Sequence, residues 1–194
     1  MNLLPISFQD YVELGVEHIA DFAAYDHMLF LLALCAPFTL RNWKKALVLA
    51  TAFTIGHSIT LIAAGLDLFR FNTVWIEFFI PVTILLTALG HWLPSKRLNQ
   101  RKFFWLCLVF GFIHGMGFST FIRFVSSKDG FVGNLLAFNL GVELGQILIV
   151  VSILLFSSMV LHFSKMKGDN WKKILSGAAI LVSLMLIVQN WPSD

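Results

Sequence analysis

Long apolar segments recur along the chain and alternate with short polar connections. They cover approximately residues 20–39, 46–66, 75–94, 103–125, 135–161 and 174–191. Each segment has about the 20 residues that an α-helix needs to cross the hydrocarbon core of a bilayer. The pattern predicts an all-α polytopic membrane protein, with a bundle of six transmembrane helices in a single integral membrane domain over residues 1–194.

A short helix is predicted before the first span. Ser7 and Asp10 have the spacing of a capping box, in which two side chains satisfy the first turn of a helix. Four residues would share the interfacial face of this helix: Phe8, Tyr11, Val12 and Val16. The first 15 residues lack the basic start and the apolar run of a cleavable signal peptide. We therefore expect an N-terminal helix that lies at the membrane interface.

The charges indicate how the helices are oriented. Charged residues make up 13% of the chain, whereas a soluble domain has about 25%. Three alternate connections, residues 41–45, 95–102 and 165–173, hold 11 of the 14 Lys and Arg residues. The positive-inside rule puts these connections in the cytoplasm and both termini on the outer, periplasmic side of a bacterial inner membrane. Because this orientation accounts for the net charge of +3, we expect a lipid bilayer as the partner and no nucleic acid.

Ionisable side chains occur within five of the six predicted spans. Counted at about 1.5 Å per helical residue from the outer ends, all of them fall in the outer half of the bilayer. A charge near the bilayer centre costs about 2.5–3.5 kcal/mol on insertion scales, so these side chains are expected to gather in one site. They are Asp26, His27, His57, Glu77, His114 and Glu143, with His18 before the first span as an entry ligand or a lid.

Histidines and carboxylates at one depth favour a bound metal. A divalent cation would neutralise two carboxylates and accept lone pairs from neutral imidazoles. Such ligands suit nickel, cobalt, zinc and iron(II) and do not select among them. The sequence therefore predicts a divalent transition-metal site without fixing the metal.

One helix face in the fifth span is polar and the opposite face is small. Asn139, Glu143 and Gln146 are spaced i, i+4 and i+7 and so form one stripe. Gly141 and Gly145 lie on the other side, where they would allow a second helix to approach closely. We expect the stripe to support the metal site, although Asn139 and Gln146 equally fit a hydrogen-bonded stripe that only holds helices together.

Hydroxyl groups surround the histidine of the second span. Thr54 and Thr60 flank His57 at i−3 and i+3, where they would orient the ring or bond the backbone. Ser58 lies about 100° round the helix from His57, which does not suit a Ser–His dyad. We expect Ser58 to support the site with the two threonines.

Two other features concern packing inside the membrane. Pro81 has no N–H, so the carbonyl of Glu77 must find a side chain, a water or a cation. Cys35 and Cys107 are expected to be small buried apolar residues rather than a disulfide or a reactive thiol.

Five segments resemble the HupE/UreJ family of small membrane proteins, which are found with hydrogenase and urease accessory genes. They are GVEHI at 15–19, DHMLFLL at 26–32, TAFTIGHSITL at 51–61, GFIHGMGF at 111–118 and FNLGVELGQ at 138–146. The resemblance implies a nickel permease that supplies nickel enzymes, with metalloenzyme maturation proteins as partners. It puts the metal path at His18, Asp26, His27, His57, His114 and Glu143. The spacing from His18 to Asp26 is longer than in related nickel permeases, and Ala24 stands where glycine is common.

Three functions fit these observations. The first is a nickel- or cobalt-type permease, or a metal-binding accessory protein. The second is a zinc-dependent membrane hydrolase or acyl transferase that acts on a lipid, lipoprotein or peptide at the outer leaflet. In that enzyme His27, His57 and His114 would hold zinc, and a carboxylate of Asp26, Glu77 or Glu143 would be the general base. The third is a structural subunit in which the polar layer fixes helix packing.

Overall fold

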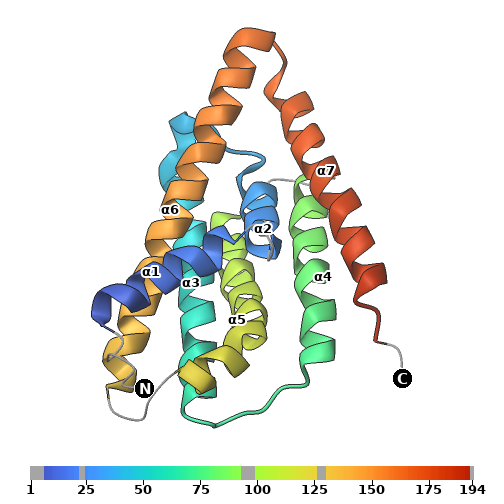
Figure 1. The fold of residues 1–194 in the computed structure, drawn as a ribbon. Helices are drawn as coiled ribbons and strands as arrows, with labels where there is room; N and C mark the ends of the chain where they lie inside the picture. The colour runs from blue at the N-terminus through green and yellow to red at the C-terminus, as the bar shows by residue number, and fades with distance from the viewer. Residues whose placement is uncertain (1–6, 22–24, 93–98, 126–129, 193–194) are drawn as a thin grey trace.

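The chain is helical throughout the part that the computed structural model describes, which is residues 7–21, 25–92, 99–125 and 130–192, with the side chains of 119–125 outside that part. Seven α-helices and one short 3₁₀ helix follow one another (Figure 1). They are α1 Phe8–Ala20, α2 Asp26–Cys35, η1 Leu40–Asn42, α3 Trp43–Gly65, α4 Thr73–Trp92, α5 Gln100–Val125, α6 Phe131–Ser164 and α7 Gly168–Gln189. Among the described residues there is no strand, which confirms the all-α class.

The predicted count of six spans is not matched. Within the described residues, four helices are long and apolar enough to cross a membrane: Leu40–Gly65, Thr73–Trp92, Phe131–Ser164 and Gly168–Gln189. The predicted first span, 20–39, is not one helix, because α1 ends at Ala20 and α2 covers only 10 residues. Those 10 residues rise about 15 Å, half of a hydrocarbon core. Pro37 follows the end of α2 closely and prevents its extension.

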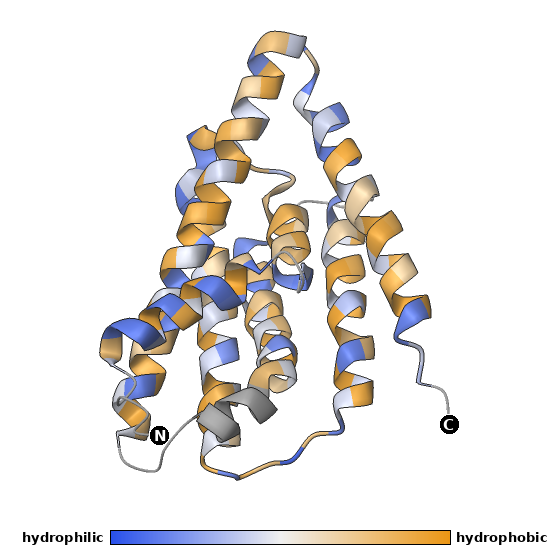
Figure 2. Cartoon of the chain, in the orientation of Figure 1, coloured by the Kyte–Doolittle hydropathy of each residue, from blue (hydrophilic) through white to orange (hydrophobic). Residues whose placement is uncertain are grey.

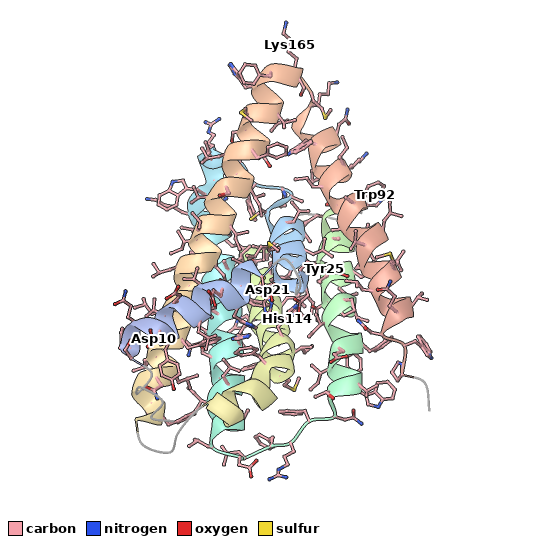
Figure 3. All side chains as sticks on the ribbon, in the orientation of Figure 1. Asp10, Asp21, Tyr25, Trp92, His114 and Lys165 are labelled. Carbon is pink, nitrogen blue, oxygen red and sulfur yellow. The ribbon has the colours of Figure 1, made fainter. Side chains whose placement is uncertain are left out.

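The long helices are arranged in pairs. The closest packed pairs are α3 with α5, α1 with α6, and α4 with α7. α6 and α7 meet at a turn at one end of the molecule, and they diverge toward the other end, where α3 connects to α4 (Figure 1). Lys165 marks the α6–α7 turn, and His114 lies far from it at mid-height (Figure 3). Hydrophobic residues cover most of α4, α6 and α7, whereas α1 carries several hydrophilic residues (Figure 2).

The cap predicted for α1 is present. The Ser7 backbone N–H donates to the Asp10 carboxylate at 2.7 Å, and the Asp10 backbone N–H donates to the Ser7 hydroxyl oxygen at 3.2 Å. The bond from the Ser7 backbone, and then the one from its side chain, lowers the pKa of the Asp10 carboxyl below its ordinary value. α1 therefore begins at a fixed residue before it crosses the bundle.

α1 packs against α6 instead of presenting all of its predicted apolar face to lipid. Tyr11, Gly15 and Ile19 are buried, while Phe8 is exposed. A Cβ added at Gly15 would lie 2.1 Å from the Phe138 carbonyl oxygen on α6. The two helices thus touch backbone to backbone, and α1 lies obliquely across α6 (Figure 1).

Glycines also bring α3 and α5 together. A Cβ at Gly56 would lie 2.0 Å from the Leu108 carbonyl oxygen, and one at Gly111 would lie 2.1 Å from the Phe53 carbonyl oxygen. Both helices therefore approach as closely as backbones allow, which is how small residues act at helix interfaces in membranes. The close contact sets His57 of α3 beside the helix that carries His114.

Pro81 lies inside α4 and has the predicted consequence. The carbonyl of Glu77, which loses its helical partner, accepts a bond of 3.4 Å from the Asn190 side-chain amide beyond the end of α7. A side chain, one of the partners predicted for this carbonyl, therefore lies within its reach.

Candidate metal centre

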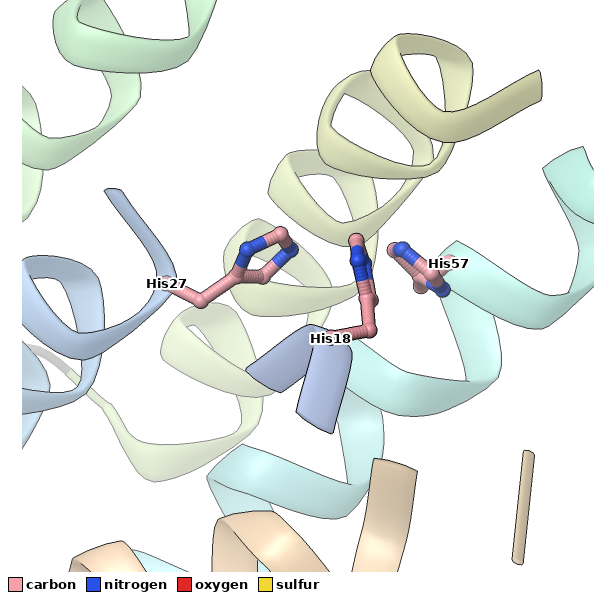
Figure 4. A group of neighbouring side chains, drawn as sticks. All are labelled: His18, His27 and His57. Atoms are coloured by element: carbon pink, nitrogen blue, oxygen red, sulfur yellow. The ribbon is translucent and has the colours of Figure 1, made fainter. Parts of the chain in front are cut away.

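Three histidines from three different helices converge in the bundle. His18 comes from α1, His27 from α2 and His57 from α3, and one ring nitrogen of each lies within 4.8 Å of the others (Figure 4). The ring centroids are 4.7 Å apart for His18 and His27, 5.5 Å for His18 and His57, and 5.8 Å for His27 and His57. We call these three residues the histidine trio. Nitrogens this close can reach one cation after small side-chain rotations.

Local structure explains the convergence. His18 lies in the last turn of α1, one turn beyond the Gly15 crossing with α6. His27 is the second residue of α2, which begins beside the trio. His57 is inside α3 and completely buried, on the side of α3 that faces α5, since a Cβ at Gly115 of α5 would lie 2.6 Å from the His57 carbonyl oxygen.

Most ring nitrogens of the trio have no hydrogen-bond partner in the described part of the chain. Within the trio, Nε2 of His18, Nε2 of His27 and both ring nitrogens of His57 are buried and have no hydrogen-bond partner among the described residues. Buried polar groups are normally satisfied, and an unsatisfied group costs about 1–3 kcal/mol. A neutral imidazole has one lone-pair nitrogen, so a divalent cation would accept one lone pair from each ring and remove that part of the cost. The residues therefore fit a transition metal.

His114 lies next to the trio on the α5 side. Its ring centroid is 5.4 Å from that of His27, and its Nδ1 lies 3.0 Å from the Phe110 carbonyl oxygen. That contact makes Nδ1 the donor and leaves Nε2 as an acceptor, which is buried and unpartnered among the described residues. His114 is not within the 4.8 Å group, but it is the nearest additional imidazole that a cation at His27 would meet.

Asp26 is the carboxylate beside the trio. Its Oδ1 lies 3.4 Å from Nδ1 of His27, and the side chain is about a quarter exposed. A carboxylate next to a ligand imidazole orients the ring and adds negative charge near a cation. Both roles agree with the predicted place of Asp26 in the site.

The polar stripe of α6 meets α3 at a different level. The Thr51 hydroxyl donates to the Glu143 carboxylate at 2.6 Å, and the Thr54 hydroxyl donates to the Gln146 side-chain oxygen at 2.8 Å. Thr51 precedes His57 by six residues, about 9 Å along the helix. The trio does not include Glu143. Asn139 keeps a buried side-chain oxygen without a partner among the described residues.

The hydroxyls around His57 do not bond its ring, and those of Thr60 and Ser58 bond the backbone. Thr60 donates to the carbonyls of Gly56 at 3.2 Å and Phe112 at 3.0 Å, which ties α3 to α5. Ser58 donates to the Thr54 carbonyl at 2.7 Å. Of the two roles predicted for these hydroxyls, the geometry of Thr60 and Ser58 matches backbone bonding.

Glu77 is not brought to the histidines. Its side chain is exposed on α4, in the first two turns of that helix. His91 is near the other end of α4, where its ring contacts Phe103 at 5.0 Å. His162 is exposed near the end of α6. The structure therefore gathers His18, His27, His57, His114 and Asp26, and leaves Glu77 and Glu143 elsewhere.

An open cavity of about 590 Å³ leads to His18. Its lining includes two acidic side chains, Glu17 and Asp21, and the ring of Phe118. The other lining residues are Leu14, Val16, His18 and Ala20. A cation would thus meet negative charge before it meets the imidazole.

Aromatic rings adjoining the histidines are the part of the site that the sequence reasoning missed. The ring of Phe118 contacts His18 at a tilt, with centroids 3.8 Å apart, and Phe30 and Phe53 contact His114 at 5.3 and 4.8 Å between ring centroids. The sequence does contain a signal for them, because the histidines of α2, α3 and α5 each have a phenylalanine three or four residues away. That spacing puts both rings on one helix face.

Apolar helices long enough to cross a membrane, together with a buried histidine cluster, define a polytopic membrane protein with a candidate metal site. The chain belongs to the HupE/UreJ family: the family model described as HupE / UreJ protein matches residues 3–193, nearly the whole chain. Comparison with curated proteins and with solved structures gives no match.

Proposed function

We propose that the protein binds a divalent transition-metal cation at the histidine trio and carries it across the membrane, as a nickel- or cobalt-type permease. The observation that carries this proposal is the meeting of three imidazoles from α1, α2 and α3, with buried ring nitrogens that have no partner among the described residues. Membership of the HupE/UreJ family supports nickel or cobalt as the cargo. His114 and Asp26 are the further residues that we assign to the path.

The site lies nearer to one face of the membrane. His57 is eight residues from Gly65 and fourteen from Trp43, about 12 Å and about 21 Å along α3. Trp43 lies within the cation-rich residues 41–45. The Leu40 backbone N–H donates to the Ser158 hydroxyl oxygen, near the end of α6, at 3.3 Å. We propose that this end is cytoplasmic and that the cavity beside His18 opens to the periplasm of a bacterial inner membrane.

Neutral imidazoles suit reversible binding in this position. The three neutral imidazoles do not neutralise a bound cation. Of its positive charge inside the membrane, only the part next to the Asp26 carboxylate is offset. A carrier must release its cargo, and a site with few carboxylates holds the cation less tightly than a fully neutralising one. Metalloenzyme maturation proteins would receive the cation on the cytoplasmic side.

Metal uptake by cells tests the proposal. Cells that express the protein should accumulate more nickel or cobalt than cells without it, and His57→Ala should abolish the increase. His162→Ala is the matched control, because His162 is exposed and outside the trio. Uptake that His57→Ala leaves unchanged would contradict the proposal.

A zinc-dependent membrane enzyme is the second candidate, and one observation favours it. Three histidine ligands leave the fourth tetrahedral position of zinc open, and the cavity beside His18 would admit a substrate from the outer leaflet. Asp26 would then be the carboxylate nearest to the ligands. Tightly bound zinc in the purified protein, without any metal uptake by cells, would favour this enzyme over the permease.

A further inference from the structure

A layer of three phenylalanines lies directly on one side of the histidines. Phe30 follows His27 by three residues on α2, Phe53 precedes His57 by four on α3, and Phe110 precedes His114 by four on α5. α2 runs opposite to α3 and α5 in Figure 1, so all three rings lie toward the same end of the bundle. This is the end with the cation-rich residues 41–45.

The phenylalanine layer is packed and closed. Phe30, Phe53 and Phe110 are 0%, 1% and 4% exposed. The rings of Phe30 and Phe53 stack with centroids 4.5 Å apart, and Phe30 meets Phe110 edge to face at 6.3 Å. A hydrated cation cannot enter packed apolar rings, so a path from the cavity at His18 ends at this layer.

The three rings belong to helices that are packed in different ways. Phe53 and Phe110 belong to α3 and α5, which Gly56 and Gly111 lock together backbone to backbone. Phe30 belongs to α2, a helix of 10 residues that contributes both His27 and Phe30. A displacement of α2 therefore moves a ligand of the cation and a ring of the layer together.

We propose that Phe30, Phe53 and Phe110 form the inner gate of the cation path, and that α2 opens it by carrying His27 and Phe30 as one unit. That a metal cation is what passes this gate rests on the proposed transport function. Its position rests only on the packing of the rings. Binding at His27 biases the position of α2, and the position of α2 sets whether Phe30 closes against Phe53 and Phe110.

A native thiol reports on the gate without any metal. Cys107 is buried on α5, three residues beyond Phe110 toward the cation-rich end. In a Cys35→Ala background Cys107 is the single thiol of the chain. A small, positively charged methanethiosulfonate reagent is added to vesicles from the side of α1, and the rate of Cys107 modification is measured.

In the parent protein Cys107 should react slowly, and Phe30→Ala should raise the rate at least about tenfold. Phe103→Ala is the matched control, because Phe103 is also a buried ring of α5 but lies outside the layer. Phe30→Leu, which keeps most of the volume, should give a smaller increase and covers the case in which Phe30→Ala fails to fold. A rate for both Phe30 variants no higher than that of Phe103→Ala would overturn the gate.

The coupling through α2 has its own readout. Adding Ni²⁺ to the parent protein should change the rate of Cys107 modification by about threefold or more, and His27→Ala should remove this change. An unchanged rate with Ni²⁺ would overturn the role of α2. If uptake by cells fails while Phe30→Ala still exposes Cys107, the transport function is wrong and the closed layer stands.

Discussion

Gly15 and Gly141 face each other where α1 crosses α6, and a Cβ built on Gly15 would lie 3.0 Å from the Cα of Gly141. A Cβ on Gly141 would in turn lie 2.0 Å from the Val12 carbonyl oxygen. The pair sets the height and direction of α1, and hence the position of His18 one turn later. Glycine is required here because backbone atoms, which cannot rotate away, occupy the space of a side chain.

Gly141→Ala should therefore displace α1. We expect a loss of about 1–3 kcal/mol in stability, as for overpacking in a closed interface, and a metal affinity at least about tenfold weaker, since His18 leaves the trio. Thermal unfolding and metal titration measure the two effects.

Gly133→Ala is the control on the same helix, because nothing lies within 4 Å of its added Cβ. Alanine is the better helix former by about 0.5–1 kcal/mol, so this variant should be as stable as the parent or slightly more stable. Equal behaviour of the two variants would show that the crossing does not position His18.

The α3–α5 contact gives a second prediction. Gly56→Ala puts a Cβ 2.0 Å from the Leu108 carbonyl oxygen and should destabilise the protein by about 1–3 kcal/mol or more. In Gly117→Ala the added Cβ meets only side-chain atoms, Cδ1 of Ile80 at 3.1 Å and Cγ2 of Ile76 at 3.7 Å, so this variant should be tolerated. Unfolding by denaturant in detergent ranks the two variants. The opposite ranking would mean that α3 and α5 are not locked at Gly56.

Glu143 should matter for packing more than for the cation. Glu143 is not part of the trio, and Glu143→Gln keeps an acceptor for the Thr51 hydroxyl. Metal affinity should therefore change by less than about threefold, or about 0.7 kcal/mol. Glu143→Leu leaves the Thr51 hydroxyl without its acceptor and should cost about 1–3 kcal/mol of stability. Titration with nickel and thermal unfolding check both. A severe loss of metal affinity in Glu143→Gln would make Glu143 a ligand after all.

Metal binding should weaken as the pH falls, because protons compete with the cation for the same imidazole nitrogens. Three histidine ligands give a steeper dependence of affinity on pH than two. Over the pH range in which the imidazoles of the metal-free protein take up protons, the slope for His18→Ala should be smaller than for the parent protein by about one proton. Identical slopes would remove His18 from the ligand set.

The sequence predicts the long helices well because their apolar patterns are continuous. The predicted spans 46–66, 75–94, 135–161 and 174–191 correspond to α3, α4, α6 and α7 with shifts of a few residues at their ends. The first span fails for a physical reason. Apolar composition over 20–39 shows burial, but burial arises equally when a short helix packs inside a bundle.

The sequence predicts how far along its helix each site residue lies, but only partly which way its side chain points. Counting residues along a helix gives the height of a side chain but not the neighbour it faces. The sequence predicts that Glu143 and Glu77 lie in one layer with His57. In the structure Glu143 accepts a hydrogen bond from Thr51 of α3, and Glu77 is exposed. His18 joins His27 and His57 through the crossing of α1 and α6, which depends on long-range packing at Gly15 that no local pattern specifies.

Direct measurement of metal bound to the purified protein tests the central claim, that the histidine trio is a cation site. The parent protein should bind about one equivalent of nickel or cobalt, and His18→Ala and His57→Ala should each bind at least about tenfold more weakly. His91→Ala, which removes a half-buried histidine at the far end of α4, should bind like the parent. A parent protein that binds no divalent transition metal at neutral pH, or histidine variants that all bind equally well, would contradict the claim.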